Sequence, residues 1–259
     1  MRQAGASVDF WRHALARRAI LWAGETRPMT AKAESVRAMF TRIAGRYDLM
    51  NSVMTGGRHH AWRRLTAAAV ADAPEGPALD LATGTADLAL AVRAAAPRRT
   101  VIGADFAEAM LGEARRKLGA RRATRVALLA ADALALPFAD KTFACVTSAF
   151  LLRNLADLPA GLAEMRRVTM AGGLVAALEI TRPGVPGWDA LFALYFNRLV
   201  PLIGALVAGD RAAYTYLPQS VERFVTPAEL GRLMERAGLR AVHYRRLGLG
   251  TIAVHMGSA

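Results

Sequence analysis

The chain has 259 residues, enough for one large α/β domain with a full hydrophobic core. Hydrophobic residues make up 54% of the sequence, which excludes a disordered or fibrous protein, and the single cysteine, Cys145, excludes a disulfide framework or a zinc ribbon and indicates a reducing compartment. The formal net charge is +13, but only three of the 34 basic residues are lysine. A GC-rich genome produces such an arginine bias, so the charge alone says little about a polyanionic partner.

Residues 1–28 mix aromatic residues with five arginines. They predict either a basic amphipathic helix on a membrane or an upstream extension before an alternative start at Met29. We expect no secretory signal, because no small-residue cleavage site follows a clean apolar run. The most apolar stretch, Trp188–Val207, is interrupted by Asp189 and Arg198 and predicts a poor membrane span.

The middle of the chain alternates short apolar segments with helical ones, after helices expected between residues 31 and 70. Strands are expected at Ala78–Ala82, Thr100–Ala104, Val126–Ala130, Phe143–Ala149 and Leu174–Ile180, with helices at Ala86–Ala95, Ala107–Leu118 and Leu158–Thr169 between them. Strands buried on both faces and alternating with helices predict a doubly wound, mostly parallel sheet.

The last part of the chain completes this domain. Its segments are an apolar helical insert from Pro183 to about Val207, the segment Tyr214–Phe224, a helix at Pro227–Ala237 and two strands, Ala241–Leu247 and Thr251–His255, which we expect to pair as a hairpin. Thr226 and Glu229 form a capping-box pattern before the helix. We therefore expect a single domain at 29–259, with a seven-stranded α/β sheet, N-terminal helices and a helical lid at about 183–216.

Polar residues follow the first three predicted strands at the edge where ligands of α/β sheets bind. Asp80 precedes a tight turn that contains Gly84 and Thr85. Asp105 ends the second strand, where a carboxylate can accept both hydroxyls of a ribose. Asp132-Ala133 ends the third strand, where an acid beside an apolar wall suits an adenine. These positions predict an adenosine-containing ligand.

The turn after the first strand narrows the choice of ligand. It lacks the G-x-G-x-x-G pattern that lets the backbone approach a pyrophosphate. Instead Ala82, Gly84 and Ala86 stand at alternate positions after Asp80. This spacing resembles motif I of the S-adenosylmethionine-dependent methyltransferases, whose ligand carries an amino-acid tail and a sulfonium in place of phosphates.

Four further segments narrow the resemblance. They are Tyr47-Asp48-Leu49-Met50-Asn51, Arg153-Asn154-Leu155, Gly172-Gly173 with Leu178-Glu179-Ile180, and Tyr214 to Ser220. From about Val36 to Met256 the chain resembles the ubiquinone/menaquinone biosynthesis C-methyltransferases. The resemblance implies a Rossmann-like methyltransferase fold and C-methylation of a polyprenyl quinol ring by S-adenosylmethionine, without a metal. The substrate would be demethylmenaquinol, the corresponding ubiquinol precursor, or both.

The same resemblance assigns three residues to the reaction. Arg153 stabilises the quinolate or assists its deprotonation through water, Asn154 orients the substrate, and Tyr47 completes the site. Because arginine stays charged at any ordinary pH, we favour the electrostatic role for Arg153. The alternatives are a helix-capping loop for Arg153-Asn154 and core packing for Tyr47.

The chain departs from the family pattern at several positions. Ala86 replaces a glycine of motif I, and Leu151 replaces a glycine after the fourth strand. Ala149 stands where the family has a serine, which leaves Ser148, one residue earlier and on the opposite strand face, as the candidate cofactor contact. Met170-Ala171 replaces a Lys-Pro pair. These differences leave room for a divergent substrate.

Other functions remain to be weighed against this one. A nucleic-acid methyltransferase would carry an Asp/Asn-Pro-Pro-aromatic loop after the fourth strand or a cysteine nucleophile on a loop, whereas Cys145 lies within a strand, so we expect no nucleic-acid partner. Methylation of another lipid or small molecule, or a non-catalytic role in a quinone-synthesis assembly, stays open. The adjacent His59 and His60 should point to different faces of a helix without a third ligand, so we expect no metal site.

The predicted substrate also sets expectations for partners and location. An isoprenoid tail must be collected from a bilayer, so we expect a cytoplasmic protein whose arginines make peripheral contact with anionic lipid. The apolar insert Trp188–Val207 would either enclose the tail or form a dimer interface. A homodimer or a quinone-synthesis complex is compatible with the sequence.

Overall fold

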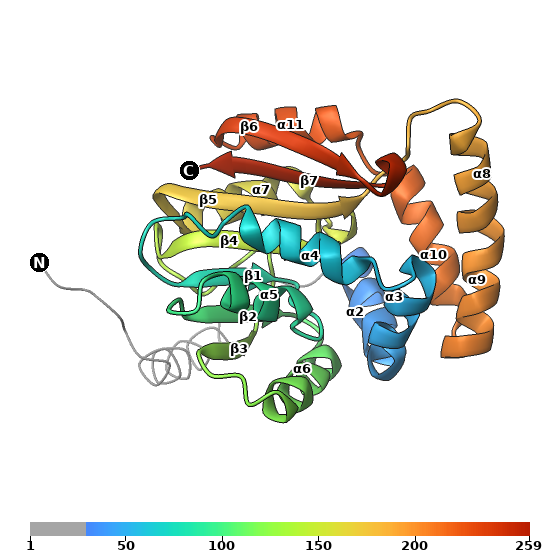
Figure 1. Ribbon diagram of the computed structural model, residues 1–259, viewed down its shortest axis with the longest axis horizontal. Coiled ribbons are helices and arrows are strands. Elements are labelled where there is room, and N and C mark those ends of the chain that lie inside the picture. Colours follow the sequence, from blue (N-terminus) through green and yellow to red (C-terminus); the bar gives the residue numbers. More distant parts are fainter. Residues whose placement is uncertain (1–29) are drawn as a thin grey trace, which may run out of the picture.

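The computed structural model describes residues 30–259, so the two readings of residues 1–28 lie outside it. Its strands are β1 (Ala78–Leu81), β2 (Val101–Asp105), β3 (Val126–Ala130), β4 (Phe143–Ala149), β5 (Thr169–Ile180), β6 (Arg240–Leu247) and β7 (Ile252–Ser258). They form one sheet in the order β3-β2-β1-β4-β5-β7-β6 (Figure 1). The first five strands are parallel, and β7 pairs antiparallel with both β5 and β6. The predicted doubly wound sheet and closing hairpin are confirmed.

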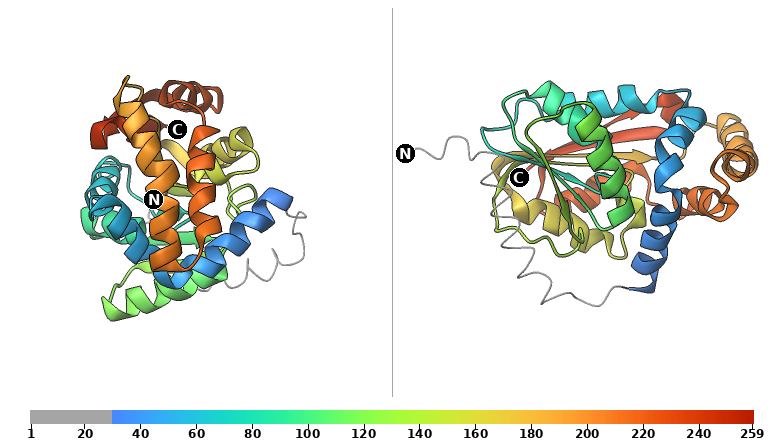
Figure 2. Two further views of the ribbon diagram at one scale, coloured as in Figure 1. Left: turned by 90° about the vertical axis from the view of Figure 1, so that its right-hand side faces the viewer. Right: turned by 90° about the horizontal axis from the view of Figure 1, so that it is seen from below.

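The helices cover both faces and one end of the sheet (Figures 1 and 2). They are α2 (Ala31–Ile43), α3 (Tyr47–Thr55), α4 (His59–Ala68), α5 (Asp87–Ala95), α6 (Glu108–Ala120), α7 (Leu158–Val168), α8 (Trp188–Leu194), α9 (Val200–Ile203), α10 (Arg211–Glu222) and α11 (Pro227–Arg236). A π-helical turn, η3 (Tyr195–Leu199), joins α8 to α9, and a second one, η4 (Gly204–Ala208), extends α9, so that the four form one long helical stretch. The predicted capping box of Thr226 and Glu229 begins α11.

Two hydrophobic cores lie on the two faces of the sheet. One joins the sheet to α7 and α11 through Leu162, Met165, Leu230 and Met234. The other joins it to α4, α5 and α6 and includes Cys145, which is fully buried within β4 as predicted. Because both faces of β1 and β2 are covered, every residue of these strands is buried.

The start of β5 is the main error in the predicted boundaries. The sequence predicts a helix up to Thr169 and a strand only from Leu174, but β5 begins directly at Thr169. The pairing with β4 shifts between Phe143 and Cys145, and Gly172 adopts a φ of +73° within the strand. A glycine supplies this left-handed conformation, so the strand passes through an irregularity that its apolar pattern does not reveal.

Helices α2, α3, α8, α9 and α10 gather at the end of the sheet where the parallel strands finish (Figure 1). Met39 and Met50 pack there with Phe196, Val200 and Tyr214. A side chain at Gly204 would lie 2.3 Å from the Tyr214 ring, so this glycine lets the long helical stretch approach α10 closely. These helices enclose the space above the strand ends.

Candidate active site

The turn after β1 is fixed by the carboxylate at the end of β2. The Gly84 amide donates to Oδ2 of Asp105 at 2.8 Å, and the Ala107 amide donates to Oδ1 at 2.9 Å. Burial raises the pKa of Asp105 to about 6 in spite of these bonds. Each carboxylate oxygen has a further lone pair with which to accept a ligand hydroxyl.

Asp80 braces the same turn from β1. Its carboxylate accepts the Thr83 hydroxyl at 2.7 Å and the Thr147 hydroxyl at 2.9 Å. Burial raises the pKa of Asp80 to about 6, against the opposing effect of these two hydrogen bonds. Asp80 therefore ties the ends of β1 and β4 together beneath the turn.

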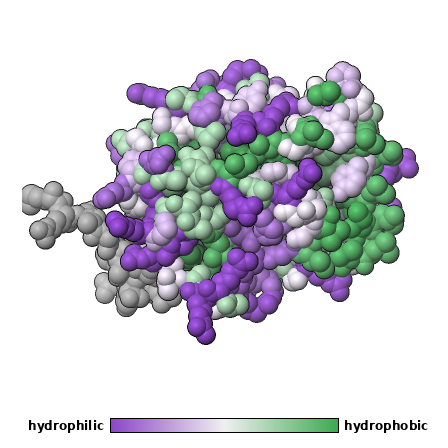
Figure 3. All heavy atoms as spheres, in the orientation of Figure 1, coloured by the Kyte–Doolittle hydropathy of each residue, from purple (hydrophilic) through white to green (hydrophobic). Residues whose placement is uncertain are grey.

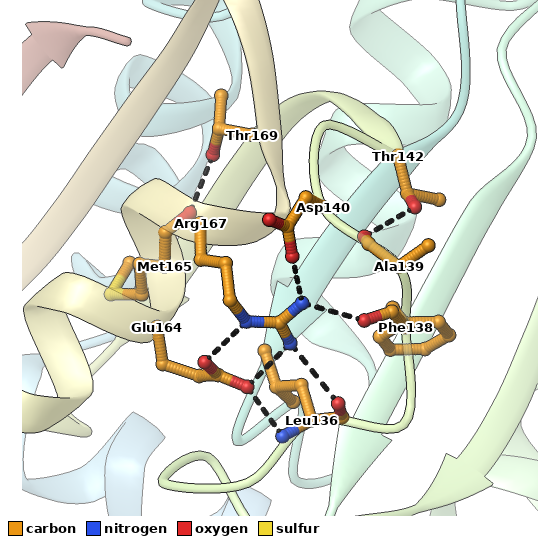
Figure 4. Close-up of polar contacts among 9 residues, drawn as sticks. All are labelled: Leu136, Phe138, Ala139, Asp140, Thr142, Glu164, Met165, Arg167 and Thr169. Carbon is orange, nitrogen blue, oxygen red and sulfur yellow. Dashed lines mark hydrogen bonds and ion pairs between the residues drawn. The ribbon is translucent and has the colours of Figure 1, made fainter.

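The loop after β3 is clamped by Arg167 on α7 (Figure 4). Its guanidinium forms a two-bond pair with Glu164, each bond 2.7 Å, and donates to the Phe138 carbonyl at 2.8 Å. Glu164 in turn accepts the Leu136 amide at 2.7 Å. This clamp holds the segment after Asp132 and supports one wall of the site.

A cavity of about 70 Å³ lies over these strand ends, and we call it the strand-end cavity. Its polar lining comes from Asp105 and Asp132, and its apolar lining includes Phe106, Met110, Ala133 and Leu134. The predicted residues Gly84, Asp105, Asp132 and Ala133 thus meet at one place. Two acids among apolar side chains suit a nucleoside.

A second, larger cavity of about 350 Å³ lies among the helices at the end of the sheet, and we call it the helical cavity. Its lining is rich in aromatic and aliphatic side chains, among them Trp62, Trp188, Phe192, Tyr195, Phe196 and Ile252. The two cavities share the lining residues Phe40, Tyr47, Phe150 and Asn154. Groups bound in the two cavities would therefore meet at these four side chains.

Arg153 lies in the helical cavity and is held from below by β5. Its Nη1 donates to Glu179 Oε2 at 3.1 Å and to the Phe150 carbonyl at 2.7 Å, and the side chains of Arg153 and Glu179 are 6% and 1% exposed. Burial raises the pKa of Glu179, and the charge of Arg153 opposes that effect. The Arg153 Nε is buried and has no hydrogen-bond partner among the described residues. Arg153 thus places a positive charge beside the cavity.

Asn154 and Tyr47 complete the junction. The Asn154 amide donates to the Phe150 carbonyl at 2.9 Å and accepts the Tyr216 hydroxyl at 3.1 Å. Phe150 adopts a φ of +64°, a strained conformation that places its carbonyl between Arg153 and Asn154. The three predicted catalytic residues, Tyr47, Arg153 and Asn154, therefore all line the helical cavity, and Tyr47 and Asn154 also line the strand-end cavity.

Comparison with known proteins identifies this arrangement. Residues 28–259 match the model of the ubiE/COQ5 methyltransferase family. The chain belongs to this family. It is 44% identical to the demethylmenaquinone methyltransferase of Roseiflexus castenholzii, over 89% of this chain and 95% of that one. It is 42% identical to the ubiquinone/menaquinone biosynthesis C-methyltransferase of Desulfotalea psychrophila, over 88% and 91%.

Solved structures agree on the fold. The [4+2]-cyclase SpnF superposes with a TM-score of 0.62 at 16% identity, over 86% of this chain and 78% of that one. An S-adenosylmethionine-dependent methyltransferase from Aquifex aeolicus gives 0.57 at 17% identity, over 81% and 96%. The chain is an S-adenosylmethionine-dependent methyltransferase with a Rossmann-like fold, as the sequence resemblance implies.

The Thr85 hydroxyl of the methyltransferase is hydrogen-bonded to side chains of α3 and α6. Its hydroxyl donates to Asp48 on α3 at 2.6 Å and accepts from Lys117 on α6 at 2.9 Å, and Lys117 also pairs with Asp48 and Asp87 at 2.6 Å. This network fastens the N-terminal helices to the turn. Thr85 does not line the strand-end cavity, and its predicted cofactor contact stays a prediction.

The other departures from the family pattern also have defined places. Ser148 is fully buried, its hydroxyl has no partner among the described residues, and it lines neither cavity, whereas Ala149 lines the strand-end cavity. Ala86 precedes α5 with a φ of +69°, a conformation that costs a residue other than glycine about 1–2 kcal/mol. The alanine at position 86 therefore strains the turn where the family pattern has a glycine.

The expectation that His59 and His60 point apart is wrong. Their ring centroids lie 3.8 Å apart, and donor atoms of His59, His60 and Asp87 all lie within 4.8 Å of one another. His59 is buried, with its Nε2 3.1 Å from the Ser52 hydroxyl of α3, and His60 is exposed beside it. However, Asp87 pairs with Lys117 and His59 Nδ1 accepts from Arg63, so two cations flank the cluster and oppose metal binding.

The positions of Glu179, Asp48 and Tyr216 give them structural roles that sequence reasoning missed. Each belongs to a motif that carried the family resemblance, but no role follows from the motif alone. The one available signal was a carboxylate inside an otherwise apolar strand at Glu179, because such a group is buried only with a partner.

Asp105 gives the methyltransferase a testable pH dependence. Only the ionised carboxylate can accept both ribose hydroxyls, and its pKa is about 6, so affinity for S-adenosylhomocysteine should fall as the pH drops below 6, by at most about tenfold per pH unit. Asp105→Asn should bind roughly 10–100-fold more weakly at pH 8, because its amide group faces a backbone N–H. Titration calorimetry from pH 5 to 8 measures both.

The pKa of Asp80 is also about 6, so its ionisation affects binding over the same pH range. Comparing the wild type with Asp105→Asn separates the effect of Asp105, because Asp80 is present in both. The ratio of wild-type to Asp105→Asn affinity should shrink as the pH falls from 7 to 5. A constant ratio over that range would show that ionisation of Asp105 plays no part in binding.

Proposed function

We propose that the chain methylates a ring carbon of a polyprenyl quinol, either demethylmenaquinol or the corresponding ubiquinol precursor. The observation that carries the proposal is the junction of an acid-lined cavity at the strand ends with a larger apolar cavity, at Phe40, Tyr47, Phe150 and Asn154. The names of the relatives, demethylmenaquinone methyltransferase and ubiquinone/menaquinone biosynthesis C-methyltransferase, support this substrate class.

The lining of the strand-end cavity suits the adenosine part of S-adenosylmethionine. Asp105 would accept the ribose hydroxyls, and Asp132 with Leu134 would take the edge and face of the adenine. S-adenosylmethionine supplies an electrophilic methyl group. The remaining task of the protein is to hold the ring carbon in line with that methyl group and to make the carbon nucleophilic.

Arg153 and Asn154 would perform that task. A quinol ring carbon becomes nucleophilic when a hydroxyl group loses its proton and its charge spreads into the ring. Arg153 lines the helical cavity, and its positive charge would stabilise the charge of the quinolate oxygen. Asn154 is fixed by Phe150 and Tyr216 and would orient the ring, while apolar side chains exclude water.

A methylation assay tests the proposed activity. Purified protein is mixed with methyl-labelled S-adenosylmethionine and with each reduced substrate in turn, demethylmenaquinol and the demethylated ubiquinol precursor. We expect label on a ring carbon of at least one quinol, and the preferred substrate shows whether the chain acts on naphthoquinols or benzoquinols. If neither quinol gains label while both ligands bind, the chain is not the proposed enzyme.

We also propose that the long helical stretch rests on a membrane surface. Trp188–Val207 has the length and mean hydropathy of a membrane span, yet one of its faces lines the helical cavity with Trp188, Phe192 and Phe196. The other face exposes Leu191, Leu194, Leu199, Leu202 and Leu206. Figure 3 shows this apolar surface at the end of the molecule that holds α8 and α9. An isoprenoid tail could pass from the bilayer into the cavity beneath it.

Two leucines test the membrane contact. Leu194 and Leu206 are 58% and 78% exposed, and each would add about 1.5–3 kcal/mol of binding if it entered the bilayer. The double variant Leu194→Glu/Leu206→Glu should therefore bind anionic vesicles at least roughly 100-fold more weakly. Vesicle sedimentation measures the binding.

Leu65→Glu is a matched control, because Leu65 is exposed on α4, away from the long helical stretch. It should bind vesicles as the wild type does. Unchanged vesicle binding by the double variant contradicts membrane contact through this helix. A wild-type dimer that the double variant converts to a monomer would instead assign the leucines to a dimer interface.

A further inference from the structure

A third cavity, of about 20 Å³, lies beside the turn after β1 and is unused in the proposed reaction. We call it the polar cavity, and its lining includes Arg63, Asp80, Thr83, Thr85 and Asp87. It shares Tyr47, Ala82, Gly84 and Ala149 with the strand-end cavity. A ligand that fills the strand-end cavity could therefore extend a group of a few atoms into the polar cavity.

Arg63 is the unusual member of this lining. It is only 5% exposed, and no carboxylate in residues 30–259 lies within ion-pair distance of it. Its guanidinium lies 5.4 Å from the centre of the Phe150 ring. Asp80 and Asp87 attract Arg63 from a distance, since its charge opposes the rise in pKa that burial causes in both, but neither bonds to its guanidinium. Arg63 therefore keeps N–H donors for an anionic ligand.

His59 fixes Arg63 in place without neutralising it. The Arg63 Nη1 donates to Nδ1 of His59, and arginine has no acceptor, so this nitrogen must be unprotonated. The other ring nitrogen lies 3.1 Å from the Ser52 hydroxyl. Burial, aided by the charge of Arg63, lowers the pKa of His59 to about 4, so the histidine stays neutral at ordinary pH.

The remaining charges of the polar cavity are already engaged. Asp87 pairs with Lys117, so its charge is balanced. Asp80 binds the hydroxyls of Thr83 and Thr147 but keeps further lone pairs. The cavity thus offers one cation to which no carboxylate is bonded and one carboxylate with acceptor capacity. A zwitterion with an anionic and a cationic group matches this pattern.

We propose that Arg63 binds the α-carboxylate of the methionine portion of S-adenosylmethionine. With the nucleoside held by Asp105 and Asp132, the amino-acid tail extends along the turn into the polar cavity. Asp80 lies there to accept from the α-ammonium group. This assignment rests on the use of S-adenosylmethionine by the family, and it holds whichever acceptor is methylated.

Two ligands that differ only in the carboxylate test the assignment. S-adenosylhomocysteine carries it, and decarboxylated S-adenosylhomocysteine lacks it. By titration calorimetry at pH 7.5, the wild type should prefer the first ligand by about 10–100-fold, the usual value of a charge-assisted hydrogen bond. Arg63→Met should lose most of that preference, with affinity for the decarboxylated ligand changed by no more than about twofold.

Arg64→Met is the matched control, because Arg64 is the exposed neighbour of Arg63 on α4. It should retain the full preference, and Arg63→Lys should retain part of it, since a cation remains. If Arg63→Met fails to fold, the Arg63→Lys and wild-type preferences still decide the matter. A wild type without preference, or an Arg63→Met or Arg63→Lys variant with the full preference, overturns the assignment. These measurements need no quinol and no turnover, so they are independent of the methylation assay.

Discussion

Arg153→Met is expected to lower kcat for quinol methylation by about 10²–10³-fold, because it removes the positive charge that stabilises the developing quinolate. Arg153 does not line the strand-end cavity, so affinity for S-adenosylhomocysteine should stay within about twofold of the wild type. The pH at which kcat rises should also move upward. A cation lowers the pKa of a nearby quinol hydroxyl, and without it more alkaline solution is needed to form the quinolate. Steady-state kinetics from pH 6 to 9 measure both effects.

The loss of Arg153 also leaves Glu179 buried without its partner, so the folding of the variant must be followed by thermal melting. Arg153→Met/Glu179→Gln removes both charges and provides a better-folded comparison. Arg236→Met is an exposed-arginine control on α11 and should retain wild-type kinetics. If Arg153→Met has the kcat of the wild type, or if the dependence of kcat on pH is unchanged, Arg153 does not stabilise the quinolate.

Much of the site could be predicted because strand ends of a parallel sheet converge. Asp105 and Asp132 follow different strands, yet the topology alone places both at one edge, and the structure confirms their meeting in the strand-end cavity. Apolar segments also located the five parallel strands, and the two strands expected as a closing hairpin are β6 and β7. The start of β5 could not be predicted, because Gly172 and the shifted pairing interrupt its pattern.

Contacts between side chains of distant segments could not be predicted. Glu179 lies 26 residues from Arg153 in sequence, and only the pairing of β4 with β5 brings them to 3.1 Å. The convergence of His59 and His60 likewise depends on rotamers at the first turn of α4, which helical periodicity does not specify. The sequence thus indicates which strands and helices lie close together, whereas the contacts between individual side-chain atoms depend on the packing.

Glu179→Gln is expected to lower the free energy of unfolding by about 3–5 kcal/mol, the usual cost of removing one partner from a buried ion pair. Glu179 also accepts the Leu152 amide at 2.5 Å, so the substitution loosens the turn that carries Arg153. Loss of this anchor should lower the maximal kcat. Urea unfolding monitored by circular dichroism measures the stability change.

The dependence of kcat on pH should distinguish the role of Glu179 from that of Arg153. Glu179 partly balances the charge of Arg153, so in Glu179→Gln the uncompensated guanidinium should shift the rise of kcat to lower pH, opposite to the shift in Arg153→Met. The stability losses should also not add. Arg153→Met/Glu179→Gln leaves no buried charge and should be more stable than the summed single losses imply, by about 1–3 kcal/mol. If the stability losses of the two single variants add, and if both variants shift the kcat profile in the same pH direction, then the Arg153–Glu179 pair does not control the ionisation of the quinol.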